Sequence, residues 1–277
     1  MPESPEVQAL VEFLGERPTG RRIGGVDVLE FRTVKTRQSP PSTLVGAQVT
    51  GASRHGKHVA LALGEETTLV VSLGRHGWMR WREPGDEAPS SADAPPALAE
   101  FAFDDGGVLE VTDAGTWVSL GLHVVDDAMA VPAIAKLGPD PAHPAFSRAD
   151  LEAALGGRRK QLKAILQEQE SLAGIGNAYS DEILHAAQTS PVIHAAALDD
   201  AAHDRLYTAI VQTVRGAIDA RRGIPIHELK AAKVAAMRVH GRAGEACPVC
   251  ADTIRDFSFG GTTAQYCPTC QTGGAAL

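Results

Sequence analysis

The four cysteines of this chain lie together near its C-terminal end, and their spacing constrains the fold more than any other feature. They form two Cys-x-x-Cys pairs, Cys247 with Cys250 and Cys267 with Cys270, separated by sixteen residues. Two thiolates can converge on one ion from each turn, and the segment between them is long enough for a β-hairpin. Two disulfides or four unrelated thiols are the alternatives, although no secretory signal favours disulfides. The spacing predicts a structural Zn²⁺ site, because four sulfur ligands leave no open coordination position for catalysis.

Length and overall charge limit the remaining possibilities. A chain of 277 residues can form two domains with cores of their own. No apolar run reaches membrane-spanning length, and the first residues lack the basic and apolar regions of a signal peptide. We therefore expect a soluble, cytoplasmic protein, nucleoid-associated if it is bacterial. The formal net charge of −8 by itself argues against a polyanionic partner.

The charges are, however, unevenly distributed. The segment from Glu83 to Asp105 has seven acidic residues and no Lys or Arg, whereas residues 158–163 include four cations. From residue 215 onward there are eight basic residues against five acidic ones. A local positive field can bind a polyanion despite a negative total charge. The alternative is that these cations only form a solvated face.

The hydrophobic pattern predicts an α+β protein with two domains and a zinc finger. A helix is expected to begin at Ser4 and Pro5, with apolar residues at helical spacing behind them. Short strands follow, which predicts a β-sandwich over residues 1–126; they are expected at 23–29, 48–53, 59–63, 68–72, 102–103 and 108–112. The next domains are predicted as a hinge at 127–146, a helical domain at 147–238 and the zinc finger at 239–277. Helices are expected at 151–155, 161–167, 178–187 and 199–222.

The N-terminus contains a candidate nucleophile. Pro2 permits removal of the initiator Met, which would leave a free secondary amine followed directly by Glu3. An α-amino group titrates near ~8 in model peptides, so a useful fraction is neutral and nucleophilic near neutral pH. Such an amine can attack a sugar C1′ and form an iminium while the adjacent carboxyl moves protons. Alone the pattern is weak, because Pro at position 2 is common for reasons of processing.

A predicted turn between two strands contains a second group of candidate residues. Residues 53–58 place four basic or titratable side chains around Gly56, which permits a close backbone approach. This turn can present Lys57 to a phosphate or to a reacting sugar. The alternative is an ordinary polar hairpin tip.

A glycine-rich turn separates two predicted helices. Gly174 and Gly176 allow a compact reversal, and Asn177 is placed to cap the next helix. Backbone NH groups and the Asn amide would then converge on one phosphate oxygen, with Lys163 adding positive charge. The alternative is a helical hairpin without any ligand.

Together these motifs resemble the formamidopyrimidine-DNA glycosylase/endonuclease VIII family of base-excision repair enzymes. The motifs that carry the resemblance are Met-Pro-Glu-x-Pro-Glu-Val, Arg-x-Gly-Lys, Leu-Gly-Pro-Asp-Pro, Gly-Ile-Gly-Asn-x-Tyr and His-Gly-Arg-x-Gly-Glu-x-Cys, in this order along essentially the whole chain. The resemblance implies an N-terminal β-sandwich with a leading helix and a C-terminal helix-two-turn-helix domain with a zinc finger. It also implies damaged double-stranded DNA in the cleft between these domains. We expect a monomer.

The resemblance further implies roles for individual residues. Pro2 looks like the nucleophile that displaces a damaged base and forms a Schiff base, Glu3 like the general acid/base, and Glu6 like a supporting carboxylate. Lys57 looks like the cation that contacts the DNA backbone at the lesion. Further DNA-binding candidates are Lys163, Gly176, Asn177, Arg75, His76, Trp117, Arg242 and Arg255. The implied enzyme is a bifunctional DNA glycosylase and abasic-site lyase for oxidised or modified bases.

Two loops of the predicted sandwich depart from the family pattern. The turn after Asp113 has no Arg to address the orphaned base, and Trp117 replaces the usual Phe wedge. The other loop has Arg75 where a Met wedge is usual, so Arg75 and His76 can fill the space vacated by the flipped base. The alternative for Trp117 and Trp78 is that both are core aromatics.

The zinc hairpin departs as well. Thr262 stands where the family has an Arg that grips phosphates, although Arg255 lies in the preceding predicted strand. The segment 223–239 is too short for a full base-capping loop. These departures argue against a preference for 8-oxoguanine.

Two other functions therefore stay open. The missing Arg residues and the acidic net charge favour a non-catalytic or catalytically altered damaged-DNA-binding protein of the same fold. A zinc-ribbon interaction protein unconnected with DNA would require the first two domains to be incidental.

Overall fold

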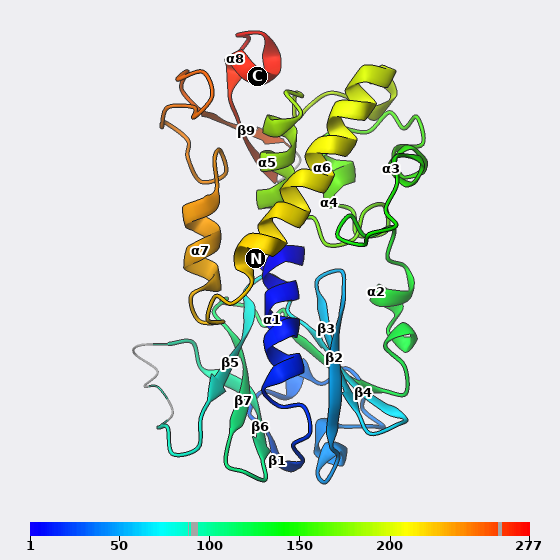
Figure 1. The fold of residues 1–277 in the computed structure, drawn as a ribbon, viewed down its shortest axis with the longest axis vertical. Helices are drawn as coiled ribbons and strands as arrows, with labels where there is room; N and C mark the ends of the chain where they lie inside the picture. Colours follow the sequence, from blue (N-terminus) through cyan, green and yellow to red (C-terminus); the bar gives the residue numbers. More distant parts are fainter. Residues whose placement is uncertain (88, 90–93, 260–261) are drawn as a thin grey trace. The chain divides into compact units, whose positions relative to one another are not determined.

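A computed structural model describes residues 1–87, 89, 94–259 and 262–277, and the chain forms two units (Figure 1). The first unit comprises residues 1–2, 6–136 and 223–228, and the second comprises residues 3–5, 137–222 and 229–277. The main boundary, between Lys136 and Leu137, lies inside the predicted hinge. Among the described helices, none combines the length and the apolar character that a membrane span requires.

The first unit contains helix α1 and two antiparallel four-stranded sheets. Helix α1 spans Ser4–Glu16. One sheet has the order β1-β6-β7-β5, from strands Ile23–Val28, Ala97–Phe103, Val108–Asp113 and Gly77–Arg82. The other has the order β2-β3-β4-β8, from strands Val49–His55, His58–Leu63, Thr67–Ser72 and Gly121–Val125. Short helices complete the unit: η1 (Phe31–Thr33), η2 (Pro41–Leu44), η3 (Ala128–Ala130) and α2 (Pro132–Ala135). This arrangement confirms the predicted β-sandwich with a leading helix.

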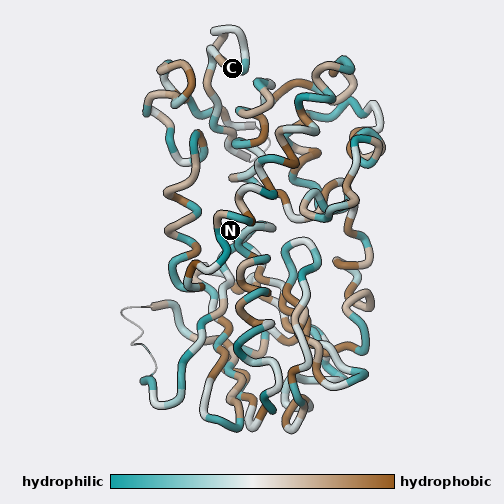
Figure 2. The backbone as a smooth tube through the Cα atoms, viewed as in Figure 1, coloured by the Kyte–Doolittle hydropathy of each residue, from teal (hydrophilic) through white to brown (hydrophobic). Residues whose placement is uncertain are grey.

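The core of this unit follows from its hydrophobic pattern. Hydrophobic residues run along the strands of the two sheets, where Figure 2 shows them in brown. Helix α1 contributes three fully buried side chains at helical spacing, those of Val7, Leu10 and Leu14. The Phe13 ring of α1 meets the Trp81 ring of β5 edge-on, with 6.4 Å between centroids. The helix is therefore part of the core of the sandwich.

The second unit is mainly helical. Its helices are α3 (Arg148–Leu155), α4 (Leu162–Gln167), α5 (Asn177–Ala186), η4 (Ala195–Ala197), α6 (Asp200–Arg221), α7 (Leu229–Ala236) and α8 (Pro268–Thr272). Ser147 and Asp150 form a capping box at the start of α3, and Asp199 caps α6 through its carboxylate. A two-stranded hairpin, β9 (Arg255–Phe259) and β10 (Thr262–Tyr266), lies between the two cysteine pairs as predicted.

Two strands and one longer helix, β5, β8 and α7, were not expected from the sequence, and neither were the short helices η1–η4, α2 and α8. Strands β5 and β8 escaped because neither shows clean alternation of apolar and polar residues. In β5, Arg80 and Arg82 donate to the buried carboxylate of Glu110 on β7. Charged residues at these positions look solvent-exposed in the sequence, although they pair with a buried group. Helix α7 lies in the segment judged too short for a capping loop. Residues 88 and 90–93, between β5 and β6 in the sequence, are outside the described part of the chain.

Shortening one buried side chain of α1 is expected to destabilise the first unit. Leu10→Ala should lower the free energy of unfolding by about 2–5 kcal/mol, because a fully buried side chain leaves a cavity. Urea denaturation followed by tryptophan fluorescence measures this loss. Leu29→Ala is the matched control, since Leu29 is 54% exposed and should change stability by less than about 0.5 kcal/mol. Equal losses in both variants would contradict the packing described for α1.

Candidate functional site

The Glu3 carboxylate lies at the N-terminus of α5. The residue is only 1% exposed and accepts hydrogen bonds from three backbone NH groups, those of Gly176, Ala178 (3.1 Å) and Tyr179 (3.4 Å). The first NH groups of a helix have no partner within the helix, and its dipole favours an anion at this end. The anion bound at this helix end is thus a carboxylate of the chain itself rather than an external phosphate.

The prediction that Asn177 caps this helix is wrong. Gly176 is the N-cap residue and Asn177 the first residue in helical conformation. The Asn177 side-chain oxygen instead accepts a hydrogen bond from the Gln167 amide at 3.2 Å. Glu3 serves as the cap from a distant part of the sequence, a contact that local spacing cannot indicate.

Lys163 of α4 is fully buried beside α5. Its ammonium donates to the Asp181 carboxylate at 2.5 Å, to the Ser180 hydroxyl at 3.0 Å and to the Asn177 carbonyl at 3.2 Å. Burial lowers the pKa of Lys163 below its ordinary value, and the charges of Asp181 and Glu3 oppose that shift. These bonds join α4 to α5, and contact with a DNA phosphate would require the ammonium to exchange one of them.

Further along α5, three polar side chains contact the segment that leads into the cysteine cluster. The second oxygen of Asp181 lies 2.7 Å from His240 Nδ1. Glu182 accepts from the backbone NH groups of residues 238–240 at 2.9–3.1 Å. His185 Nε2 lies 3.3 Å from Cys247 Sγ. Residues 181 and 185 are one helical turn apart, so one face of α5 connects Glu3 to the cysteine cluster.

The four cysteines form a metal-binding arrangement. Their Sγ atoms all lie within 4.8 Å of one another. Tetrahedral coordination with Zn–S bonds of about 2.3 Å places sulfur atoms roughly 3.8 Å apart, which matches this cluster. Burial raises the pKa of the Cys267 thiol to about 11, so a bound cation is needed to hold it as a thiolate at neutral pH. The donor set therefore fits Zn²⁺.

The other candidate catalytic residues belong to the first unit. Pro2 is buried, and Glu6 on α1 is buried as well. Lys57 is half-buried at the tip of the β2–β3 hairpin, where Gly56 has a φ of +56° that suits a two-residue hairpin turn. This tip is braced by Arg54, whose guanidinium donates to the Gly56 carbonyl at 3.0 Å and to the Gln8 amide oxygen of α1 at 2.9 Å.

Two exposed loops of the sandwich are fixed to each other. Arg75 and His76 lie in the loop before β5, and their backbones bond to the loop after β7. The Arg75 NH donates to the Ser119 hydroxyl at 2.9 Å, and the His76 carbonyl accepts from the NH of residue 114 at 3.3 Å. Asp113 holds the second loop in shape by accepting from the NH groups of Gly115 (2.8 Å) and Ser119 (3.1 Å).

The two tryptophans of these loops have different environments. Trp117 is 81% exposed, so its interpretation as a core aromatic is wrong. Trp78 is buried, and its indole NH donates to the Ile226 carbonyl at 3.0 Å, so the core interpretation is right for this residue. An aromatic side chain left in water on a braced loop is an unusual feature that suits contact with a partner.

Most of the predicted basic cluster is neutralised within the second unit. Arg158 and Lys160 both pair with Glu168, Arg158 at 2.8 Å. Burial alone would raise the pKa of Glu168, but hydrogen bonds from Arg158, Lys160 and Ser171 together lower it to about 2. Of these cations, Arg159 is exposed, and binding of a polyanion by this cluster stays a prediction.

The two cations near the finger have distinct positions. Arg242 donates to the carbonyls of Val234 (3.3 Å) and Met237 (3.4 Å), at the C-terminal end of α7. Arg255 is exposed on β9, opposite Tyr266 of β10. Arg242 thus has a structural contact, and DNA binding by either residue stays a prediction.

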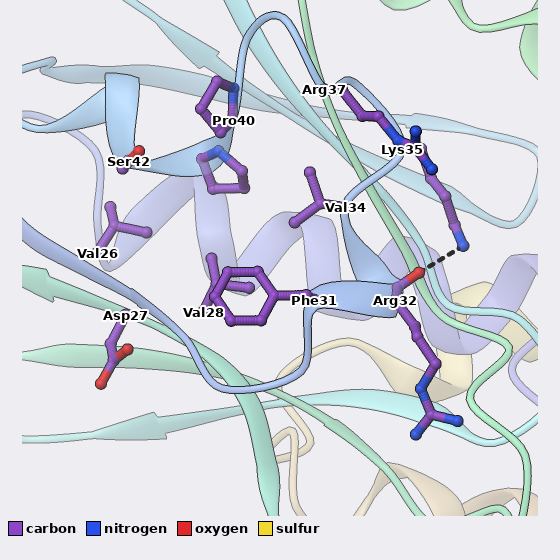
Figure 3. A pocket seen from close by; sticks show the side chains of 11 residues that line it. Val26, Asp27, Val28, Phe31, Arg32, Val34, Lys35, Arg37, Pro40 and Ser42 are labelled. Atoms are coloured by element: carbon purple, nitrogen blue, oxygen red, sulfur yellow. Dashed lines mark hydrogen bonds between the residues drawn. The ribbon is translucent and has the colours of Figure 1, made fainter.

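A groove of about 890 Å³ in the first unit is separate from the candidate site. Apolar residues Val26, Val28, Phe31 and Val34 line it together with several cations, and Lys35 donates to the Arg32 carbonyl at 2.8 Å (Figure 3). None of the residues that the sequence marked for catalysis, metal binding or DNA contact lines this groove.

The sandwich, the helical unit and the four-cysteine finger, in this order, define a modular architecture that known proteins share. Family models match three consecutive parts: the formamidopyrimidine-DNA glycosylase N-terminal domain at residues 1–117, the formamidopyrimidine-DNA glycosylase H2TH domain at 137–227, and the zinc finger found in FPG and IleRS at 244–273. A formamidopyrimidine-DNA glycosylase of Heliobacterium modesticaldum is 33% identical over 98% of this chain and 100% of its own length. The chain belongs to the formamidopyrimidine-DNA glycosylase/endonuclease VIII family.

Other relatives agree with this assignment. An uncharacterized formamidopyrimidine-DNA glycosylase-like protein of Mycobacterium tuberculosis is 45% identical over 51% of this chain and 88% of its own length. The structure of Lactococcus lactis FPG (MutM) in complex with Fapy-dG-containing DNA has a TM-score of 0.86 at 25% identity, covering 98% of this chain and 100% of that one. The complex of Lactococcus lactis Fpg with abasic-site DNA has a TM-score of 0.85 at 25% identity, covering 98% and 99%.

Sequence reasoning missed the polar residues of α5 and Lys233 of α7, whose ammonium lies 3.1 Å from Glu3 Oε1. Asp181 and Glu182 stand directly before Ile183 and Leu184, which are fully buried. Two adjacent acids inside an apolar helical stretch are a usable signal, because buried carboxylates require partners. Lys233 of α7 has no comparable signal, since an isolated Lys on a short helix is common.

Loss of the Asp181 charge is expected to destabilise the second unit strongly. Asp181→Asn leaves the buried Lys163 ammonium without its ion-pair partner, which should cost about 3–5 kcal/mol at neutral pH. The pKa of Lys163 in the folded variant falls further below its ordinary value of 10.5, so the unfolded chain binds more protons. Stability of the variant should consequently rise with pH up to that value, as measured by denaturation at several pH values.

The matched control for this change is Asp204→Asn. Asp204 pairs with Arg148 at 2.5 Å, but its side chain is 66% exposed, so the loss should stay below about 1 kcal/mol. Comparable losses for the two variants, or no pH dependence for Asp181→Asn, would contradict the buried ion pair.

Proposed function

We propose that this protein is a base-excision repair DNA glycosylase with abasic-site lyase activity, acting on oxidised or otherwise modified bases in double-stranded DNA. The observation that carries this proposal is the match of the whole chain to formamidopyrimidine-DNA glycosylases, with Pro2 and Glu3 at its start. Solved structures of a Lactococcus lactis relative contain Fapy-dG or abasic-site DNA, which supports the same substrate class here.

The proposed chemistry begins at the amine of Pro2 once Met1 has been removed. The nitrogen attacks the sugar C1′ of the damaged nucleotide, the bond from C1′ to the base breaks, and the base leaves with a proton. The bond from C1′ to the ring oxygen O4′ then breaks, O4′ takes up a proton, and C1′ becomes an iminium with the Pro2 nitrogen. The iminium acidifies the C2′ proton, and its removal expels the 3′ phosphate, which cleaves the strand.

Glu3 is proposed to move the protons in this sequence. It directly follows Pro2 in the chain, and its carboxylate is held by three backbone NH groups at the start of α5. A carboxylate held in place directly after the nucleophile in the chain supports a role in general acid/base catalysis. Lys57, at the braced hairpin tip, is proposed to contact the DNA backbone at the lesion, and Glu6 to support the site.

The exposed loops of the sandwich are proposed to fill the space left by the extracted base. Enzymes that act on a flipped base fill the gap with wedge side chains and kink the duplex. Trp117, with Arg75 and His76 on the adjacent loop, supplies an exposed aromatic ring and polar side chains for this purpose. Because no Arg stands in the loop after Asp113, the identity of the opposite base is expected to matter little.

Capture of the Schiff base tests the proposed reaction directly. Borohydride reduction in the presence of abasic-site DNA should link the parent protein covalently to DNA, whereas Pro2→Gly should give at least tenfold less product. A set of duplexes with one defined lesion each, assayed for base release and for strand cleavage, then identifies the substrate. Tight binding of damaged DNA without any adduct would instead establish a non-catalytic DNA-binding protein.

The cysteine cluster is proposed to hold a structural Zn²⁺. When bound, the ion would supply the crosslink that orders the finger, and the four thiolates would complete its coordination. His185 would contact the Cys247 ligand from α5. This role requires no catalytic water, because all four positions are filled by sulfur.

Removal of the metal is expected to unfold the finger before the rest of the chain. The purified protein should contain one Zn²⁺ per chain. A strong chelator should weaken DNA binding more than tenfold. Much of the circular dichroism signal of the sandwich should remain. Cys250→Ser should lose the zinc, whereas Ser258→Ala on the exposed hairpin should retain it. Full zinc content in Cys250→Ser would refute the four-thiolate site.

A further inference from the structure

Lys233 of α7 contacts the carboxylate on which the proposed chemistry depends. Its ammonium lies 3.1 Å from Glu3 Oε1, and its side chain is 12% exposed. The same ammonium lies 4.9 Å from the centroid of the Tyr179 ring, within cation–π range. Tyr179 lies in the first turn of α5 and Glu3 caps that turn, so Lys233 contacts two groups at this helix end.

The helix that carries Lys233 is itself fixed. Leu229, its first residue, is fully buried. At its other end, the Arg242 guanidinium donates to the carbonyls of Val234 and Met237, which belong to the end of a helix where intrahelical i→i+4 donors run out. Lys233 is therefore presented from a helix anchored at both ends, and its approach to Glu3 is determined by the fold.

The charges around Glu3 explain why this contact matters. A carboxylate removed from water is costly unless it is hydrogen-bonded and paired. Three backbone NH groups supply only partial charges, and Lys163 on α4 is bonded directly to Asp181. Asp181 and Glu182 on α5 add negative charge nearby. Lys233 supplies a full positive charge bonded directly to the Glu3 carboxylate.

We propose that Lys233 is a positioning residue that keeps Glu3 ionised and correctly oriented to accept a proton. A cation hydrogen-bonded to a carboxylate favours its charged form, and a base must be in that form to remove the C2′ proton. The inference rests on the proposed function and adds to it a residue for which the sequence predicted no role.

The test measures strand cleavage at a preformed abasic site under single-turnover conditions. Lys233→Met should slow cleavage roughly tenfold or more at neutral pH, as expected for the loss of a charge-assisted hydrogen bond. The rate should recover as the pH rises, because the carboxylate then ionises without the cation. The Kd for DNA should stay within about threefold of the parent value, and Lys233→Arg should restore most of the rate.

Two comparisons separate this role from a structural one. Lys136→Met removes a charge at an exposed position outside the site and should cleave at the parent rate. If Lys233→Met folds poorly, Lys233→Gln and Lys233→Arg replace it, with the same loss expected for Gln and the same rescue for Arg. Melting temperatures within a few degrees of the parent show that folding does not explain the slower rate.

Several results would overturn the inference. These are a parent-like rate for Lys233→Met at neutral pH, a loss that neither Arg nor higher pH restores, and weaker DNA binding with an unchanged rate at saturation. The last result would make Lys233 a phosphate contact. If the parent protein itself forms no borohydride adduct and cleaves no DNA, the proposed function fails; if it does both and Lys233→Met equals it, only the inference fails.

Discussion

The buried carboxylate of Glu3 is the contact on which the arrangement of the second unit depends. A carboxylate with 1% exposure is tolerated only where donors surround it, and the start of α5 provides three backbone NH groups for this purpose. The NH of Ser4 donates to the Gly174 carbonyl at 3.0 Å, so the extended N-terminal segment is fixed on both sides of the carboxylate. The glycines of this turn let the backbone approach closely. A helix end that would suit an external anion is thereby used to fix the residue next to the proposed nucleophile.

In the first unit, ordered loops hold side chains in exposed positions, where a partner can contact them. Trp117 is kept in water by a loop whose backbone is held by Asp113, and the neighbouring loop is bonded to it through Ser119. Lys57 is similarly presented by a hairpin tip that Arg54 ties to α1. Because the backbone of each loop is already ordered, contact with a partner would cost little additional conformational entropy.

The sequence was informative where local pattern and chemistry coincide. Cysteine spacing indicated the finger and its hairpin, and periodicity indicated α1 and most strands of the sandwich. Strands β5 and β8 were missed, because buried Arg–Glu pairs and short length hide their alternation. Contacts between residues far apart in sequence were also inaccessible: Glu3 capping α5 and Lys233 reaching Glu3 both depend on how elements pack. Asn177 fitted a local capping pattern, and a more favourable long-range acceptor replaced it.

The polar face of α5 makes the stability of the helices depend on the presence of the finger. Its buried acids and imidazole are satisfied only when the backbone at 238–240 and Cys247 are in place, and those groups need the helix in return. Unlike zinc modules that fold as independent domains, this finger shares its buried polar contacts with helix α5. Deleting the C-terminal forty residues would therefore leave orphaned charges in the truncated protein and should yield an insoluble fragment rather than a smaller working enzyme.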